Sequence, residues 1–180
     1  MESLKIILLS VAAAIGYGVA HDQVTIRVCP EYFTLAHAPL FHSGSLTLVA
    51  LGWGVVATWW AGLAIGIALA IAARAGPLQK FTWRHFLRPI ALLLIVMAVV
   101  AALAGFAGWW LSTTGRIADL QAWATMLPFE QQSAFMGDVW AHASSYLTGS
   151  IGGLLLIVST LWRRVSAPAP EVKMPTRTPC

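Results

Sequence analysis

Residues 89–115 read PIALLLIVMAVVAALAGFAGWWLSTTG, and no side chain in this run is charged. Two further uncharged runs cover residues 32–73 and 139–162. Each run is longer than the roughly 20 apolar residues that an α-helix needs to cross the hydrocarbon core of a bilayer. A fourth apolar segment, residues 6–20, is shorter. The pattern predicts an integral membrane protein with four transmembrane helices.

Composition supports the same class. Of the 180 residues, 58% are hydrophobic and only 10% are charged, and the mean hydropathy is +0.75. A water-soluble domain of this size needs far more charge to cover its surface. We therefore predict an all-α integral membrane protein whose residues 1–165 form one four-span helical bundle in the lipid bilayer. The expected spans are about residues 4–20, 45–73, 89–112 and 139–162.

Basic residues are sorted to one side of this predicted topology. The two terminal segments and the loop 74–88 together carry nine Lys and Arg against two acids. Residues 21–44 and 113–138 carry two Arg against five acids. Because Lys and Arg near short loops stay in the cytoplasm, we expect both termini to be cytoplasmic, in a multi-pass protein of the cytoplasmic (inner) membrane. The same bias accounts for the pI near 9.5, so the charge is no argument for a nucleic-acid partner.

The two segments on the opposite side are expected to differ in structure. Residues 21–44 should form an irregular extracytoplasmic cap, in which the alternation from Val24 to Val28 predicts a short extended segment that ends at Pro30. Residues 113–138 should form a protruding helical hairpin with its tip near Pro128, because the segments on both sides of this proline are longer than a span. The proline-rich residues 166–180 are predicted to be a disordered cytoplasmic tail.

Residues 1–20 admit two interpretations. Lys5, an apolar stretch and the small residues Gly18 and Ala20 fit a signal peptide that is cleaved before His21. An uncleaved, alanine-rich helix near the minimum spanning length also fits. Glu2 disfavours the signal peptide, because such peptides begin with a positively charged region, and we expect this segment to be retained.

Two local features bear on partners. Gly62 and Gly66 form a small-xxx-small motif on which another helix can approach closely. We expect that helix to belong to the same chain, with a homodimer or other membrane subunits as alternatives. Cys29 and Cys180 lie on opposite sides of the predicted topology and cannot pair within one chain. For Cys29, a disulfide across a dimer, a metal ligand and a buried thiol all stay open, and the last is the commonest.

The strongest local pair of polar residues is Asp138 and His142, which lie four residues apart and therefore share one helical face. Ser145 and Gly149 continue this face with small side chains, so the pair should point into the bundle beneath the cap. A carboxylate that orients an imidazole, or two ligands of one ion, fits this spacing. The competing interpretation is an Asp–His hydrogen bond with a structural role alone.

Function is open among three hypotheses. The first is a site at the extracytoplasmic surface that binds a divalent transition metal such as zinc, with Glu31 and Glu130 as candidate catalytic bases. The second is a non-catalytic accessory or assembly subunit of a membrane complex. The third is an electron carrier whose haem lies between two histidines, His21 and His142. The sequence contains no HExxH, CxxC, GxSxG, Walker A or CxxCH motif that would decide whether it is an enzyme. The candidate metal ligands are His21, Asp22, His37, Asp138 and His142.

Overall fold

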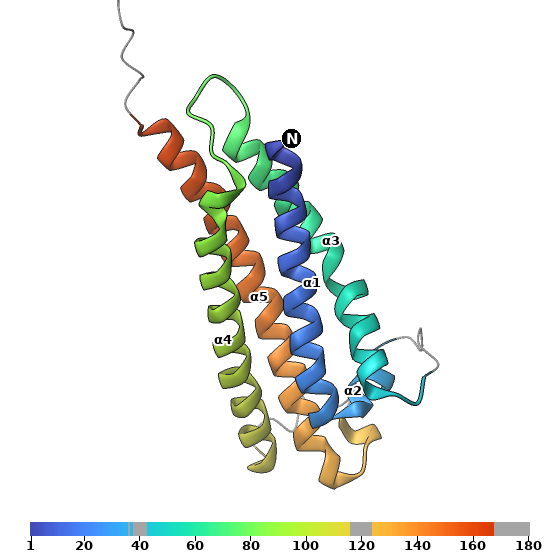
Figure 1. Ribbon diagram of the computed structural model, residues 1–180. Helices are drawn as coiled ribbons and strands as arrows, with labels where there is room; N and C mark the ends of the chain where they lie inside the picture. The colour runs from blue at the N-terminus through green and yellow to red at the C-terminus, as the bar shows by residue number, and fades with distance from the viewer. Residues whose placement is uncertain (36, 38–42, 116–123, 168–180) are drawn as a thin grey trace, which may run out of the picture.

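The computed structural model describes residues 1–35, 37, 43–115 and 124–167, and these residues are all-helical (Figure 1). Four helices are long and apolar enough to cross a membrane. The long helices are α1 (Glu2–Val28), α3 (Leu46–Arg74), α4 (Leu87–Thr113) and α5 (Phe129–Val165). The short elements are α2 (Pro30–Leu35) and the 3-10 helices η1 (Trp83–Phe86) and η3 (Ala124–Met126).

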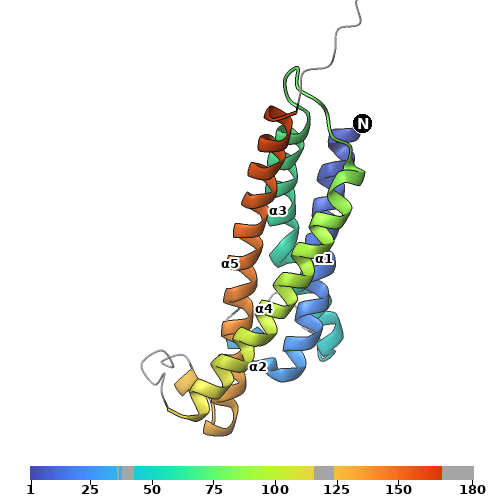
Figure 2. The same ribbon diagram turned by 90° about the vertical axis from the view of Figure 1, so that its left-hand side faces the viewer.

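The four long helices form two packed pairs. Helix α1 packs along α3, α4 packs along α5, and the pairs meet mainly through α3 and α5 (Figures 1 and 2). Helix α1 begins, and α5 ends, at the end of the bundle where the loop between α3 and η1 lies, whereas α2 lies at the opposite end. Below, these ends are called the loop end and the α2 end.

Small residues bring α1 and α3 into backbone contact. A Cβ atom built on Gly54 would lie 2.5 Å from the Cα of Val19, and one on Gly62 would lie 2.8 Å from the carbonyl oxygen of Ser10. A Cβ on Gly66 would also contact the α1 backbone. These three glycines occur at multiples of four residues along α3, so they share one face. The prediction that Gly62 and Gly66 pack within the chain is confirmed for this structure.

Helices α4 and α5 approach each other in a similar way near the α2 end. A Cβ on Gly108 would lie 2.6 Å from Cγ of Trp140 and 2.8 Å from the carbonyl oxygen of Met136. Each pair therefore has its own close contact, and these contacts fix the rotation of each helix about its axis.

Buried apolar side chains gather at the two ends of the bundle and leave its middle less filled. The cluster at the α2 end joins the short helices to the long ones: Ile26, Cys29, Tyr32, Phe33, Ala50, Trp53, Ala124, Leu127, Phe135 and Met136. The cluster at the loop end consists of Ile6, Leu69, Ala70, Ala73, Phe86 and Ile90. The space between the two clusters is described with the candidate site below.

The loop end is held by a buried arginine. Arg164 on α5 is 2% exposed, and its guanidinium donates to the carbonyl oxygens of Ala72 at 2.6 Å, Gln79 at 2.6 Å and Ala75 at 2.7 Å. Helix α3 ends at Arg74, so the Ala72 carbonyl is one of the four that a helix terminus leaves without an intrahelical partner. A cation is also favourable at this negative end of the helix dipole.

The structure corrects the predictions for residues 21–28. They are not part of an irregular cap, and residues 24–28 are not extended, because α1 continues unbroken to Val28. Asp22, Thr25 and Ile26 are buried while Val24 and Val28 are exposed, which is the three-to-four-residue period of a helix. An alternation over five residues is too short to distinguish the two periods. Helix α1 ends at Val28, and Cys29, the residue before Pro30, is its extended C-cap, which agrees with the predicted break at Cys29–Pro30.

The predicted hairpin is only partly within the described residues. Helix α4 ends at Thr113, and Gly115 adopts a positive φ of 69°, so the first arm does not continue α4 as one helix. Helix α5 begins directly after Pro128 and runs as one helix to Val165. Residues 116–123 and 168–180, which include part of the predicted hairpin and nearly all of the predicted disordered tail, lie outside the described residues.

Candidate functional site

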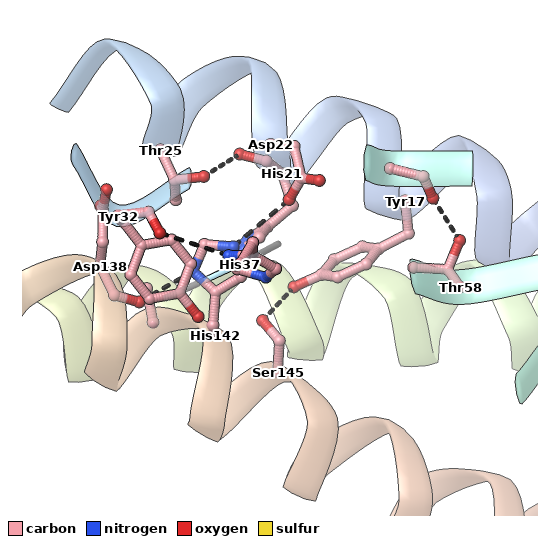
Figure 3. A network of polar contacts seen from close by, with 12 residues as sticks. Tyr17, His21, Asp22, Thr25, Tyr32, His37, Thr58, Asp138, His142 and Ser145 are labelled. Carbon is pink, nitrogen blue, oxygen red and sulfur yellow. Dashed lines mark hydrogen bonds and ion pairs between the residues drawn. The ribbon is translucent and has the colours of Figure 1, made fainter. Parts of the chain in front are cut away.

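Three of the five predicted metal ligands come together near the α2 end, where α1 approaches α5. Oδ1 of Asp22 lies 3.3 Å from Nε2 of His142, and the rings of His21 and His142 meet edge to face with centroids 4.5 Å apart. One potential ligand atom from each residue lies within 4.8 Å of the other two (Figure 3). Asp22 and His142 are each 5% exposed. Residues 120 positions apart in sequence thus form one buried polar cluster.

The hydrogen bonds of His142 restrict its protonation. Its Nδ1 lies 2.8 Å from the backbone carbonyl oxygen of Asp138, which only accepts, so Nδ1 carries the hydrogen and donates it. Its Nε2 then faces the Asp22 carboxylate, which also only accepts when ionised. A proton or a metal ion must therefore lie between Nε2 and Oδ1. Histidines that bind metals usually donate their other N–H to a carbonyl or carboxylate in this way.

The separation of the two atoms fits a shared metal ion. Zinc binds His nitrogen and carboxylate oxygen at about 2.0–2.2 Å, and at a tetrahedral angle two such ligand atoms are roughly 3.3 Å apart. The observed 3.3 Å between His142 Nε2 and Asp22 Oδ1 equals this value. His21 is the third candidate ligand, and its buried Nε2 has no hydrogen-bond partner among the described residues. The candidate ligand atoms of His21, Asp22 and His142 lie within 4.8 Å of one another, so the three residues form a potential metal site.

Aromatic residues fix the orientation of both imidazoles. The Tyr32 ring stacks on His142, with centroids 4.3 Å apart and an interplanar angle of 28°. The Tyr17 ring stacks on His21 with centroids 5.6 Å apart, and its hydroxyl is 2.7 Å from Oγ of Ser145. The sequence analysis did not assign Tyr17 or Tyr32 to the site. The sequence could have indicated the position of Tyr17, because it lies four residues before His21 and therefore on the same face of α1.

Asp138 has a different role from the one predicted. Its backbone carbonyl, not its carboxylate, contacts His142, and the carboxylate that faces the imidazole belongs to Asp22. The Asp138 side chain is nonetheless in the interior, because the residue is 2% exposed and its Oδ2 has no hydrogen-bond partner among the described residues. The site thus holds a second buried acid one helical turn from His142.

The other predicted site residues lie outside the three-residue cluster. Nδ1 of His37 is 3.3 Å from the carbonyl oxygen of Tyr32, and its ring packs against Trp53 with centroids 4.6 Å apart. Burial lowers the pKa of His37, which favours its neutral form. Glu31 accepts a hydrogen bond from the Cys29 thiol at 3.4 Å, and Glu130 is exposed in the first turn of α5. Neither glutamate is within the cluster.

Cys29 is a buried thiol in this structure. It is 1% exposed, and burial raises its pKa to about 12, so the thiol is protonated at neutral pH. A metal ligand or a disulfide partner would require the thiolate or an accessible sulfur. Of the three alternatives given for Cys29, the structure of the single chain therefore shows the buried thiol.

The geometry does not fit a haem between His21 and His142. Two axial imidazoles must point at one iron from opposite faces of a macrocycle. Here the two rings are in direct edge-to-face contact, with centroids 4.5 Å apart, so no macrocycle fits between them.

The cluster lies at one end of a cavity between the two helix pairs. The cavity has a volume of about 490 Å³ and is lined by residues from all four long helices. Its wall is mainly aliphatic, and His21, Asp22 and His142 line it together with Tyr17 and Ser145. A pocket of a few hundred cubic ångströms with a few convergent polar groups is typical of ligand sites.

Comparisons with known proteins give no further guide to this site. No protein-family model, no curated protein and no solved structure matches the chain. The functional argument therefore depends on the geometry of the site.

Proposed function

We propose that this is a membrane-embedded metal-binding protein, in which His21, Asp22 and His142 hold a divalent transition metal ion such as zinc. The contact between Nε2 of His142 and the Asp22 carboxylate carries the proposal, because these two acceptors need a proton or a metal ion between them, and their separation of 3.3 Å is that of two ligand atoms on one zinc ion. The unpartnered Nε2 of His21 supplies a third ligand. Two imidazoles and one carboxylate are a donor set that zinc prefers.

The proposed placement follows the sorting of charge. Within the described residues, Lys and Arg gather at the loop end and acids gather at the α2 end, so the positive-inside rule assigns the loop end to the cytoplasm. The metal site then lies near the extracytoplasmic surface of the cytoplasmic membrane. In this placement, helix α2 and the first turns of α5 lie on the extracytoplasmic side of the metal site.

A site with three protein ligands leaves one position open on a tetrahedral ion. An open position that holds water is the arrangement found in catalytic rather than structural zinc sites, because the metal lowers the pKa of the bound water. Asp138, buried one turn from His142, then replaces Glu31 and Glu130 as the candidate base. This hydrolytic role depends on the metal ion, so its first test is the elemental analysis described next.

Elemental analysis of detergent-purified protein tests the metal site. We expect about one zinc or similar ion per chain, and at least a tenfold loss of metal in Asp22→Asn and in His142→Gln. His85→Gln is the matched control, because His85 lies on η1 at the loop end and is exposed. Wild-type protein without metal after growth and purification with added zinc would contradict the proposal.

A non-catalytic accessory subunit is the second candidate. One observation favours it: Met126 and Phe129, at the α2 end, are 79% and 84% exposed, and such an exposed apolar pair suits contact with a partner. In that case the contact between Asp22 and His142 has a structural role alone. Asp22→Asn would then lower thermal stability, while the wild type and every variant would contain no stoichiometric metal.

A further inference from the structure

The cavity is polar at one end and aliphatic along the rest of its length. Its polar end consists of the metal site and the hydroxyls of Tyr17 and Ser145, which hydrogen-bond to each other. Toward the loop end, the wall is formed by small and aliphatic side chains, among them Ala13, Ala61, Ala68, Leu93, Met97 and Ile157. An occupant that matches this wall has one polar group and one hydrocarbon part.

The cavity opens sideways, between α3 and α5. Trp60 and Ala64 on α3 and Tyr146 and Leu154 on α5 line the cavity and are also exposed. The two helices touch directly beside Ala64 and Leu154, where a Cβ on Gly153 would lie 2.8 Å from Ile65, and again at Arg164, so the opening between them lies on the α2 side of this contact, at Trp60 and Tyr146. An opening on this lateral face of four membrane-spanning helices leads to the acyl chains of the bilayer.

The length of the cavity fits one lipid chain. His142 and Ile157 line its two ends on α5 and are 15 residues apart, which corresponds to roughly 22 Å at about 1.5 Å per residue. The hydrocarbon of one leaflet is about 15 Å thick, half of the roughly 30 Å core, so the cavity extends past the midplane and is long enough for an extended acyl chain. A lipid from the leaflet at the α2 end would extend its chain toward the loop end, in the same direction as the cavity.

The polar end excludes plain hydrocarbon as the whole occupant. A methylene chain has no donor atom for the open position of the proposed metal ion, and without the ion it would leave the buried Nε2 of His21 without a partner, which costs free energy. A metal ion with two imidazoles and one carboxylate has a net charge near +1 and an open position. An anionic oxygen, such as that of a phosphate diester, is the ligand that suits this position.

We propose that the cavity binds a glycerophospholipid from the leaflet at the α2 end, with one acyl chain along the aliphatic wall and a phosphate oxygen at the open metal position. The position of the head group rests on the proposed metal site, whereas the position of the chain rests on the cavity alone. The phospholipid is then the substrate class of any hydrolytic activity at this site.

Native mass spectrometry of protein purified in a maltoside detergent tests the inference, with metal and phosphorus measured on the same samples. Ala13 and Ala12 provide a matched pair on α1, because Ala13 lines the cavity and Ala12 is exposed and does not. We expect about one phospholipid per chain in the wild type and in Ala12→Phe. Ala13→Phe should retain at least tenfold less phospholipid and should keep its metal.

The outcomes separate the two proposals. Metal without bound phospholipid, or equal phospholipid in both alanine variants, would overturn the lipid site and leave the metal site standing. Phospholipid that depends on Ala13 in protein without metal would support the chain position and overturn the head-group assignment. Neutral diacylglycerol retained in place of phospholipid would overturn the head-group assignment as well. If Ala13→Phe does not fold, Ser150→Phe at the cavity wall and Ser159→Phe outside it provide the same comparison.

Discussion

Replacing Arg164 by alanine should destabilise the protein strongly, although sequence alone would treat this residue as one of several interfacial cations. The guanidinium makes three short hydrogen bonds to carbonyl oxygens, at 2.6, 2.6 and 2.7 Å. The Ala72 carbonyl would be left buried and unpaired, which costs about 1.5–3 kcal/mol for a bond to a charged group. Ala75 and Gln79 are exposed, so water replaces the arginine there and each bond contributes less.

The expected total is a loss of about 3–5 kcal/mol in the free energy of unfolding. For a chain of this size, that loss corresponds to a fall of about 10 °C in Tm. Arg164→Lys should recover only part of it, because an ammonium group cannot reach carbonyls in several directions at once. Arg163→Ala is the control, since Arg163 is exposed and a surface change of this kind is within about 0.5 kcal/mol.

Thermal unfolding in detergent, followed by near-UV circular dichroism, measures the shift. Limited trypsin digestion gives a second measurement of the same contact. Arg164 binds the carbonyl of Gln79, so trypsin should cleave after the neighbouring Lys80 faster in Arg164→Ala than in the wild type. Equal Tm values for Arg164→Ala and Arg163→Ala, with no faster cleavage at Lys80, would refute the assignment of Arg164 as the clamp of the loop end.

Three further predictions concern α1 and its surroundings. Gly54→Leu should unfold or expand the α1–α3 pair, whereas Gly16→Leu should be nearly neutral, because a Cβ on Gly16 meets nothing within 4 Å. Thermal unfolding in detergent compares the two variants, and equal stability would contradict the close packing of α1 on α3. In a Cys180→Ser background, Cys29 should resist iodoacetamide at pH 8 until the protein is denatured, because its pKa is raised to about 12 by burial, and rapid alkylation of native protein would argue against this burial. Intact mass of the purified protein should include residues 1–20, since Gly18 packs directly on α3, and a chain that begins at His21 would show that the first twenty residues are removed.

The helical class and the approximate spans could be predicted because they follow from the length and composition of uncharged runs. Such runs fix which segments are long and apolar enough to span, and the structure has four helices of this kind. The ends of the helices were less predictable. Residues 21–28 continue α1 because Ile26 packs into the cluster at the α2 end, a tertiary contact that no local pattern contains.

In the candidate site, too, the sequence predicted what depends on local helical period and missed what depends on tertiary contacts. The spacing of Asp138 and His142 correctly indicated that both face the interior, since helical period alone decides this. It could not indicate that the carboxylate facing His142 would be Asp22, because that depends on how α1 approaches α5. Tyr32 was not assigned to the site, because its stacking on His142 depends on the path of α2 back over the bundle.

The position of the cluster in the chain has a consequence for biogenesis. His21 and Asp22 lie on α1, which leaves the ribosome before α5, the helix that carries His142. Helices α1 and α3 can pair as soon as both are inserted, through their glycine contacts, but at that stage the cluster still lacks the α5 imidazole. Because membrane helices are made in order from the N-terminus, the site cannot capture an ion before synthesis reaches α5, and ion binding would mark the completion of the bundle.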